Sequence, residues 1–245
     1  GESAMNRVNK VKEHIRQGQK SYGFMLTFPS ATIIEIFGHL GFDHVMIDSE
    51  HGNFTPESAE EMIRAADVVG LTALVRVPDH EPSTIMRILD RGAMGIMAPH
   101  VNTRAEAEHV VQAVKYYPLG KRGLGAHRAS TFDITMTRAE YVEWANRETL
   151  IMVQLEEVEA LNNLDDILKV EHIDLYTFGP NDLSQSLGVP GQATHPKVVE
   201  AMNQASAKIR AAGKHVAGDW TMSANVPGLL ISAASAFLKE AKASK

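Results

Sequence analysis

Short apolar segments alternate with segments of helical periodicity along the whole 245-residue chain. These segments are apolar at nearly every position, which is typical of strands buried on both faces of a parallel sheet. Parallel strands need helical crossovers, and eight strand–helix repeats fill about 250 residues as one (β/α)8 barrel. We therefore predict an α/β fold with eight strands, at residues 21–28, 45–47, 72–77, 95–98, 150–155, 173–178, 214–217 and 228–232.

The segments between the predicted strands carry helix signals. Thr55-Pro56-Glu57 combines a capping threonine, a first-turn proline and a first-turn acid. No linker composition divides the chain, so we expect one TIM-barrel domain over residues 1–245, with residues 1–4 as a tag remnant. Only Thr221–Pro227 joins the last two predicted strands, which is too short for a full helix. Either this crossover is truncated or residues are missing from it.

Composition excludes several classes of protein. A net charge of −6 argues against a dedicated nucleic-acid binder. Without cysteine the chain has no disulfide, thiolate nucleophile or cysteine metal ligand. The segment Val226–Leu238 is too short to span a bilayer, and residues 6–21 lack the apolar core of a signal peptide. We expect a cytoplasmic protein that binds neither nucleic acid nor membranes.

Charged side chains gather where the predicted strands end. The apolar run Val45–Ile47 leads directly into Asp48, Glu50 and His51, and the next strand ends near Arg76. Burying an unpaired charge is costly, so these groups need partners. The carboxyl ends of barrel strands meet at one face, where ligands bind. The sequence therefore predicts an active site at this face.

Two carboxylates after neighbouring strands form the predicted metal pair. Glu156 follows the fifth strand and Asp182 follows the sixth, within Gly179-Pro180-Asn181-Asp182. Two oxygen ligands and water suit a hard cation such as Mg²⁺ or Mn²⁺. The alternative is that Glu156 is a first-turn helix acid and Asp182 an N-cap.

Arg76 and His51 are the predicted catalytic side chains, although each has a structural alternative. Arg76 needs an anionic partner, which is either a carboxylate or enolate substrate or the side chain of Asp48. His51 is a candidate general base near neutral pH, or else a structural histidine. Asp48 is expected to orient Arg76 or a metal-bound water rather than to react itself. His100, His127 and His195 are weaker candidates, and we expect His195 to be structural.

Several motifs in chain order resemble the HpcH/HpaI aldolase family of metal-dependent pyruvate aldolases. They cover about residues 20–215, and they are more specific together than singly. They are Ile47-Asp48-Ser49-Glu50-His51, Val75-Arg76-Val77-Pro78, Leu89-Asp90-Arg91-Gly92-Ala93, Pro99-His100-Val101-Asn102-Thr103, Gly120-Lys121-Arg122-Gly123, Val153-Gln154-Leu155-Glu156 and Gly179-Pro180-Asn181-Asp182-Leu183-Ser184.

The resemblance implies a TIM barrel whose C-terminal helix is exchanged between subunits, in a homo-hexamer or another homo-oligomer. It implies a divalent ion, Mg²⁺, Mn²⁺ or Co²⁺, on Glu156 and Asp182, with no nucleotide or pyridoxal phosphate. It places Arg76 on the keto or enolate oxygen of pyruvate, and His51 as the base with Asp90 as its carboxylate partner. The other residues that it places in the substrate site are Gln154, Gly179, Pro180, Asn181 and Asp182.

The implied activity is that of a class II aldolase, which reversibly cleaves 4-hydroxy-2-oxo acids to pyruvate and an aldehyde. The metal ion and Arg76 would stabilise the enolate, and His51 would take the 4-hydroxyl proton. No lysine lies at a clear strand-end position, since Lys214 begins its strand, and this disfavours a Schiff-base aldolase. The alternatives are an acyl-CoA thioester lyase, similar to the citrate-lyase beta subunit and malyl-CoA lyase, and a non-catalytic barrel that binds keto acids.

Overall fold

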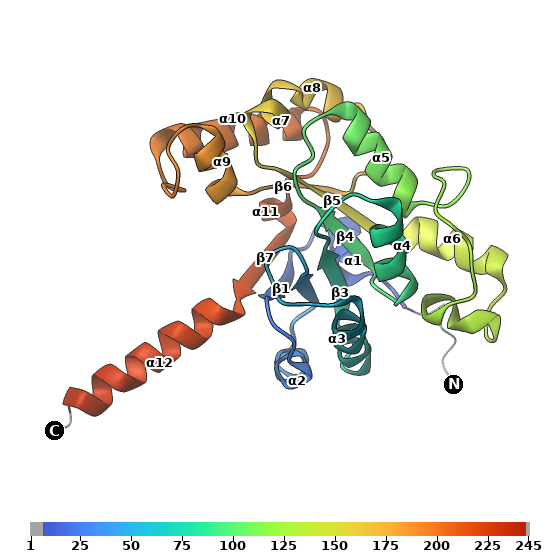
Figure 1. Cartoon of the computed structure of the whole chain (residues 1–245), viewed down its shortest axis with the longest axis horizontal. Helices are drawn as coiled ribbons and strands as arrows, with labels where there is room; N and C mark the ends of the chain where they lie inside the picture. Colours follow the sequence, from blue (N-terminus) through green and yellow to red (C-terminus); the bar gives the residue numbers. More distant parts are fainter. Residues whose placement is uncertain (1–6, 244–245) are drawn as a thin grey trace.

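One curled parallel sheet organises the computed structural model, which describes residues 7–243 (Figure 1). The predicted tag remnant lies outside the described residues. Neighbouring strands pair in parallel in the order β6-β5-β4-β3-β2-β1-β7. The strands are β1 (Ser21–Leu26), β2 (His44–Asp48), β3 (Thr72–Arg76), β4 (Gly95–Ala98), β5 (Leu150–Leu155), β6 (Leu175–Phe178) and β7 (Thr221–Asn225).

Helices connect the strands and pack around the sheet, as Figure 1 shows. Thr55 and Thr103 form capping boxes at the starts of α3 and α5, as the sequence signals predict. The helices are α1 (Lys10–Arg16), α2 (Ala31–His39), α3 (Pro56–Val68), α4 (Pro82–Asp90), α5 (Arg104–Val114), η2 (Arg128–Asp133), α6 (Arg138–Glu148), α7 (Val158–Asn162), α8 (Leu164–Ile167), α9 (Pro180–Ser186), α10 (Pro196–Ala211), α11 (Ala217–Trp220) and α12 (Val226–Ala243).

Both faces of the sheet are apolar, which explains the continuous apolar runs. Along β2, Val45 and Ile47 belong to the large core cluster that includes the helices. Met46, between them, points to the opposite face and packs in a separate cluster with Leu74 and Met152 of other strands. The curled sheet thus encloses its own small core and is covered by a larger one.

The C-terminal part of the chain differs from the prediction. The expected strand at 214–217 contributes only a single bridge, between Val216 and Tyr176, and the four-residue helix α11 follows at once. The expected strand at 228–232 is wrong, because these residues belong to α12. The last strand is instead β7, within the segment expected to be a connector, and it pairs with β1. The structure thus shows a curled seven-stranded sheet in place of the predicted eight strands.

Composition explains these errors. Thr221–Asn225 is mostly polar or small and is largely exposed, so it lacks the apolar run that marks the other strands. Leu229, Leu230 and Ile231 form such a run, but they lie exposed on a helix. Their apolar character therefore does not reflect burial within this chain.

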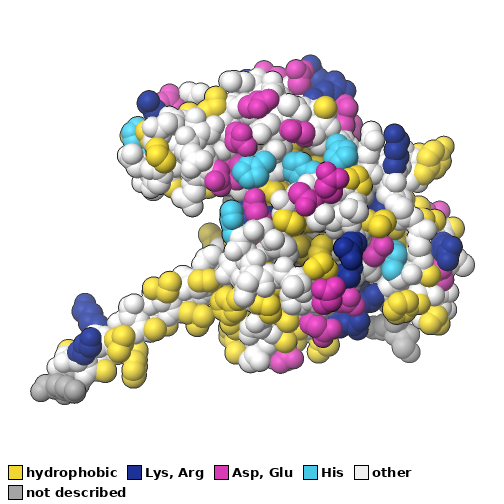
Figure 2. All heavy atoms as spheres, viewed as in Figure 1, with side chains coloured by type: hydrophobic (Ala, Val, Ile, Leu, Met, Phe, Trp, Pro, Cys, Tyr) yellow, Lys and Arg dark blue, Asp and Glu magenta, His cyan; other side chains and the backbone are white. Residues whose placement is uncertain are grey.

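Helix α12 projects away from the rest of the molecule (Figure 1). Figure 2 shows apolar side chains along it, and Leu229, Leu230, Ile231, Phe237 and Leu238 are all exposed. Of the side chains described on this helix only Val226 is buried. Among residues 7–243 no helix has the length and apolar character needed to cross a membrane.

Candidate active site

A pocket of about 240 Å³ lies at the carboxyl ends of the strands. It brings together residues that are far apart in sequence, because parallel strands end at the same edge of the sheet. The predicted residues that line it are His51, Arg76, Gln154, Gly179, Pro180, Asn181 and Asp182.

Arg76, at the end of β3, is held by two acids from the end of β2. Its Nε and Nη2 donate to the two carboxylate oxygens of Asp48 at 2.8 and 2.6 Å, and its Nη1 lies 3.2 Å from Glu50 Oε2. Asp48 is 1% exposed and Arg76 is 9% exposed. Burial alone would raise the pKa of Asp48, but the hydrogen bonds and charge of Arg76 outweigh it and lower that pKa. Asp48 is therefore an anionic partner of Arg76, as one of the two alternatives predicted. Arg76 also lines the pocket, where a substrate could reach it.

Glu156 is a buried carboxylate with few opposite charges around it. It is 1% exposed, and its oxygens accept hydrogen bonds from the His100 backbone N–H at 2.9 Å and from the Gln154 side-chain amide. Burial raises the pKa of Glu156; the charges of Asp182 and Glu50 add to this, while His100 opposes it. A cation at this position would relieve the repulsion.

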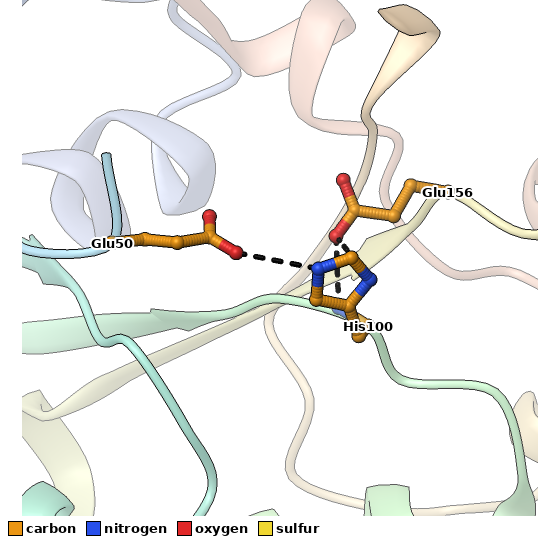
Figure 3. Close-up of side chains that lie close together, drawn as sticks. All are labelled: Glu50, His100 and Glu156. Carbon is orange, nitrogen blue, oxygen red and sulfur yellow. Dashed lines mark hydrogen bonds and ion pairs between the residues drawn. The ribbon is translucent and has the colours of Figure 1, made fainter. Parts of the chain in front are cut away.

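His100 lies between the carboxylates of Glu50 and Glu156. From the sequence alone, His100 was only a weaker candidate for the site. Its Nε2 lies 3.4 Å from Glu50 Oε1, and its Nδ1 lies 3.4 Å from Glu156 Oε1 (Figure 3). The same Nδ1 atom lies 3.0 Å from Glu157 Oε1. Burial lowers the pKa of His100, but the charges of Glu156, Glu50 and Glu157 outweigh it and raise that pKa. The available signal was its position directly after β4, in Pro99-His100.

His51 and Asp90, the predicted dyad, lie in different surroundings. The His51 side chain is 63% exposed at the pocket, with its Nε2 3.8 Å from Glu50 Oε2. Asp90, at the end of α4, lies 2.6 Å from Arg122 Nη2 and 3.2 Å from His127 Nε2. Within the described part of the chain, no hydrogen bond or ion pair joins His51 to Asp90.

The donor atoms in this region fit a divalent cation. Glu50, His100 and Glu156 each offer one ligand atom, and these atoms all lie within 4.8 Å of one another. Asp182 lines the neighbouring pocket, and its charge contributes to the raised pKa of Glu156. The Gln154 Oε1 atom is buried and has no hydrogen-bond partner among residues 7–243. Oxygen atoms together with one imidazole form a donor set that divalent metals bind.

Known proteins are similar to this chain in both sequence and fold. The hydroxypyruvate/pyruvate aldolase of Sagittula stellata is 36% identical over 206 residues, which cover 84% of this chain and 80% of that protein. The 4-hydroxy-2-oxovalerate aldolase of Rhodococcus jostii is 36% identical over 211 residues, with the same coverage. The crystal structure of an HpcH/HpaI aldolase from Desulfitobacterium hafniense superposes with a TM-score of 0.88 at 29% identity, over 94% of this chain and 96% of that one.

The family model for HpcH/HpaI aldolase/citrate lyase matches residues 22–240. This match confirms the family predicted from the motifs and, with the two aldolases above, the predicted class of enzyme. The chain belongs to the HpcH/HpaI aldolase/citrate lyase family.

Proposed function

We propose that this protein is a divalent-metal-dependent aldolase that reversibly cleaves 4-hydroxy-2-oxo acids to pyruvate and an aldehyde. The observation that carries the proposal is the pairing of two features where the strands of the sheet end. One is a buried arginine, Arg76, fixed by Asp48 and facing the pocket. The other is the buried carboxylate of Glu156, close to Asp182.

Glu156 and Asp182 are the proposed ligands of the metal ion, which is Mg²⁺, Mn²⁺ or Co²⁺. When bound, such an ion polarises the carbonyl group of a 2-oxo acid. Gln154 donates its amide N–H to Glu156 and so fixes the orientation of that carboxylate. Gly179–Asp182 also line the pocket, and we place the substrate carboxylate at their peptide groups.

Arg76 has the electrostatic role in this proposal. Its guanidinium group would donate to the substrate oxygen on which negative charge develops during carbon–carbon cleavage. Asp48 and Glu50 hold the guanidinium group before the substrate arrives, so little reorganisation is needed during the reaction.

His51 is the proposed base for the 4-hydroxyl proton. Its ring is exposed at the pocket, where a substrate hydroxyl group can reach it. Asp90 was predicted as its partner, but the contacts of Asp90 with Arg122 and His127 count against that role within a single chain.

Exchange of the pyruvate methyl protons with deuterium from solvent, followed by NMR, tests the proposal before any aldehyde is known. We expect exchange with Mn²⁺ or Mg²⁺ and none after chelation. Arg76→Lys keeps the charge but loses the two-pronged geometry, so exchange should fall roughly a hundredfold. His195→Asn is the matched control, since His195 only caps α10. Undiminished exchange in Arg76→Lys, or after chelation, would contradict the proposal.

The aldehyde partner is open to direct assay. A panel of aldehydes with pyruvate, under several metals, would define it by the rate of carbon–carbon bond formation. Pyruvate that binds without any metal-dependent exchange would instead favour the non-catalytic keto-acid-binding alternative.

A cytoplasmic location stays a prediction.

We also propose that α12 packs on another copy of this chain, in a homo-hexamer or another homo-oligomer. The support is the row of exposed apolar side chains on a helix that leaves the body of its own chain. An apolar hollow lined by Tyr22, Leu40, Phe42 and Met222 offers a matching surface at the base of that helix.

A further inference from the structure

The backbone at His100 adopts a conformation that local sequence does not favour. Its φ angle is 51°, in the left-handed region that non-glycine residues with a Cβ atom avoid. Such outliers persist where surrounding contacts hold them, and they concentrate at functional sites. Here the unusual backbone points the His100 N–H at Glu156 Oε1, at 2.9 Å, and places the ring beside Glu50 and Glu156 (Figure 3).

We propose that His100 supplies a nitrogen ligand to the metal ion that Glu156 holds, so that the site prefers a transition-metal ion to Mg²⁺. This inference rests on the proposed metal dependence of the enzyme. It adds a third ligand to the proposed pair of Glu156 and Asp182. It also means that a residue of this chain decides which class of metal ion the site binds.

The spacing of the donor atoms carries the proposal. Ligand atoms lie about 2.0–2.2 Å from a first-row ion, so two ligands of one ion lie about 3.0–3.5 Å apart. His100 Nε2 is already 3.4 Å from Glu50 Oε1, and the ligand atoms of Glu50, His100 and Glu156 all lie within 4.8 Å of one another. The side chains therefore need little movement to share an ion.

The second ring nitrogen of His100 has the partner that metal-bound histidines usually have. A histidine that binds a metal through one nitrogen donates its other N–H to a carboxylate or carbonyl group. His100 Nδ1 lies 3.0 Å from Glu157 Oε1 and 3.4 Å from Glu156 Oε1. The nitrogen left for the ion is therefore Nε2, which lies on the side of Glu50, 3.4 Å from its Oε1.

A separate observation indicates that the pocket has an unmet partner. Gln154 is 4% exposed and lines the pocket, and within the described part of the chain its Oε1 atom has no hydrogen-bond partner. Buried polar atoms in folded proteins almost always have a partner. An ion with its water shell, or a bound substrate, would provide one.

The donor type predicts the preference between metals. Mg²⁺ favours oxygen ligands and water, whereas imidazole suits ions such as Co²⁺ and Zn²⁺. Without His100 the site would consist of oxygen donors alone. The chain's own histidine therefore shifts the site toward transition metals.

The test measures metal binding directly, by calorimetric titration with Co²⁺ and with Mg²⁺. His100→Asn removes the imidazole, and asparagine tolerates the left-handed backbone. We expect this variant to bind Co²⁺ at least tenfold more weakly and Mg²⁺ within about threefold of the unchanged protein. His172→Asn is the matched control, because His172 is exposed and also has a positive φ, of 68°.

Pulsed electron paramagnetic resonance of bound Mn²⁺ gives a second readout. Nitrogen modulation from imidazole should appear in the unchanged protein and in His172→Asn, and vanish in His100→Asn. No such modulation in the unchanged protein, or equal Co²⁺ affinity in His100→Asn, overturns the inference. Metal-dependent pyruvate exchange without nitrogen modulation would reject His100 as a ligand and leave the aldolase proposal standing. Nitrogen modulation without pyruvate exchange would support His100 as a ligand and reject the aldolase proposal.

Discussion

The side chains of Glu156 and Gln154 pack directly against the backbone of Gly179, which has no side chain. A Cβ atom at Gly179 would clash with Glu156 Oε2 and lie 2.6 Å from Gln154 Nε2. The backbone at Gly179 has an ordinary φ of −104°, so space and not conformation requires glycine here. This position controls how Glu156 and Gln154 are set against the end of β6.

We expect Gly179→Ala to displace the Glu156 carboxylate and to weaken Mn²⁺ binding at least tenfold, since shifts in metal surroundings typically have this effect. Calorimetric titration with Mn²⁺ measures the loss. Gly218→Ala is the control, because a Cβ atom there meets nothing within 4 Å. Equal Mn²⁺ affinity in both variants would show that Gly179 does not set the position of Glu156.

At the scale of elements, a buried histidine links three strands at the opposite end of the sheet. His44, the first residue of β2, is 2% exposed, and its ring nitrogens lie 2.8 Å from Ser21 Oγ and 3.2 Å from Ser223 Oγ. The ring crosses over Gly23 of β1, where a Cβ atom would clash with it. The polar strand β7 is thus attached to the sheet through a side chain from the next strand but one.

Burial lowers the pKa of His44 to about 4. The unfolded chain therefore binds a proton at His44 more tightly than the folded chain does. As a result, the contribution of neutral His44 to the free energy of unfolding is complete above about pH 6.5 and is lost as the pH falls toward 4. We expect His44 to account for up to about 3 kcal/mol of the fall in unfolding free energy across that range.

Urea unfolding between pH 4.5 and 7.5 checks this value. The fall should be smaller in His44→Asn than in the unchanged protein, and His39→Asn, which removes an exposed imidazole, should behave like the unchanged protein. Identical pH profiles for all three proteins would exclude His44 as the source.

At the scale of the whole molecule, α12 is the part that its own chain leaves uncovered. Its exposed leucines, isoleucine and phenylalanine would favour association, since each square ångström of buried apolar surface contributes about 25 cal/mol. Contiguous exposed apolar surfaces of this kind mark interaction sites.

We expect Leu230→Glu to dissociate the oligomer, because a charge would be buried in the helix contact. Light scattering after size-exclusion chromatography at micromolar concentration gives the mass of each species. Ser232→Glu adds the same charge to an exposed serine of α12 and should leave the mass unchanged. A monomeric unchanged protein would rule out the proposed packing of α12.

Elements with a local sequence pattern could be predicted from the amino-acid sequence alone. Continuous apolar runs identified β1 to β6, because strands covered on both faces need such residues throughout. Polar residues at or just after the ends of those strands predicted a shared site, since strand ends in a parallel sheet share one face. Of these residues, Arg76, Gln154 and Asp182 line one pocket.

Features that depend on residues far apart in the sequence could not be predicted before the folded structure was known. Strand β7 carries no apolar run, because its place is set by pairing with β1 and by His44. The clustering of His100 with Glu50 and Glu156 arises from three different strand ends, and sequence spacing contains no measure of that distance. The separation of Asp90 from His51 likewise follows from how α4 packs, because contacts between residues far apart in the chain exist only once it is folded.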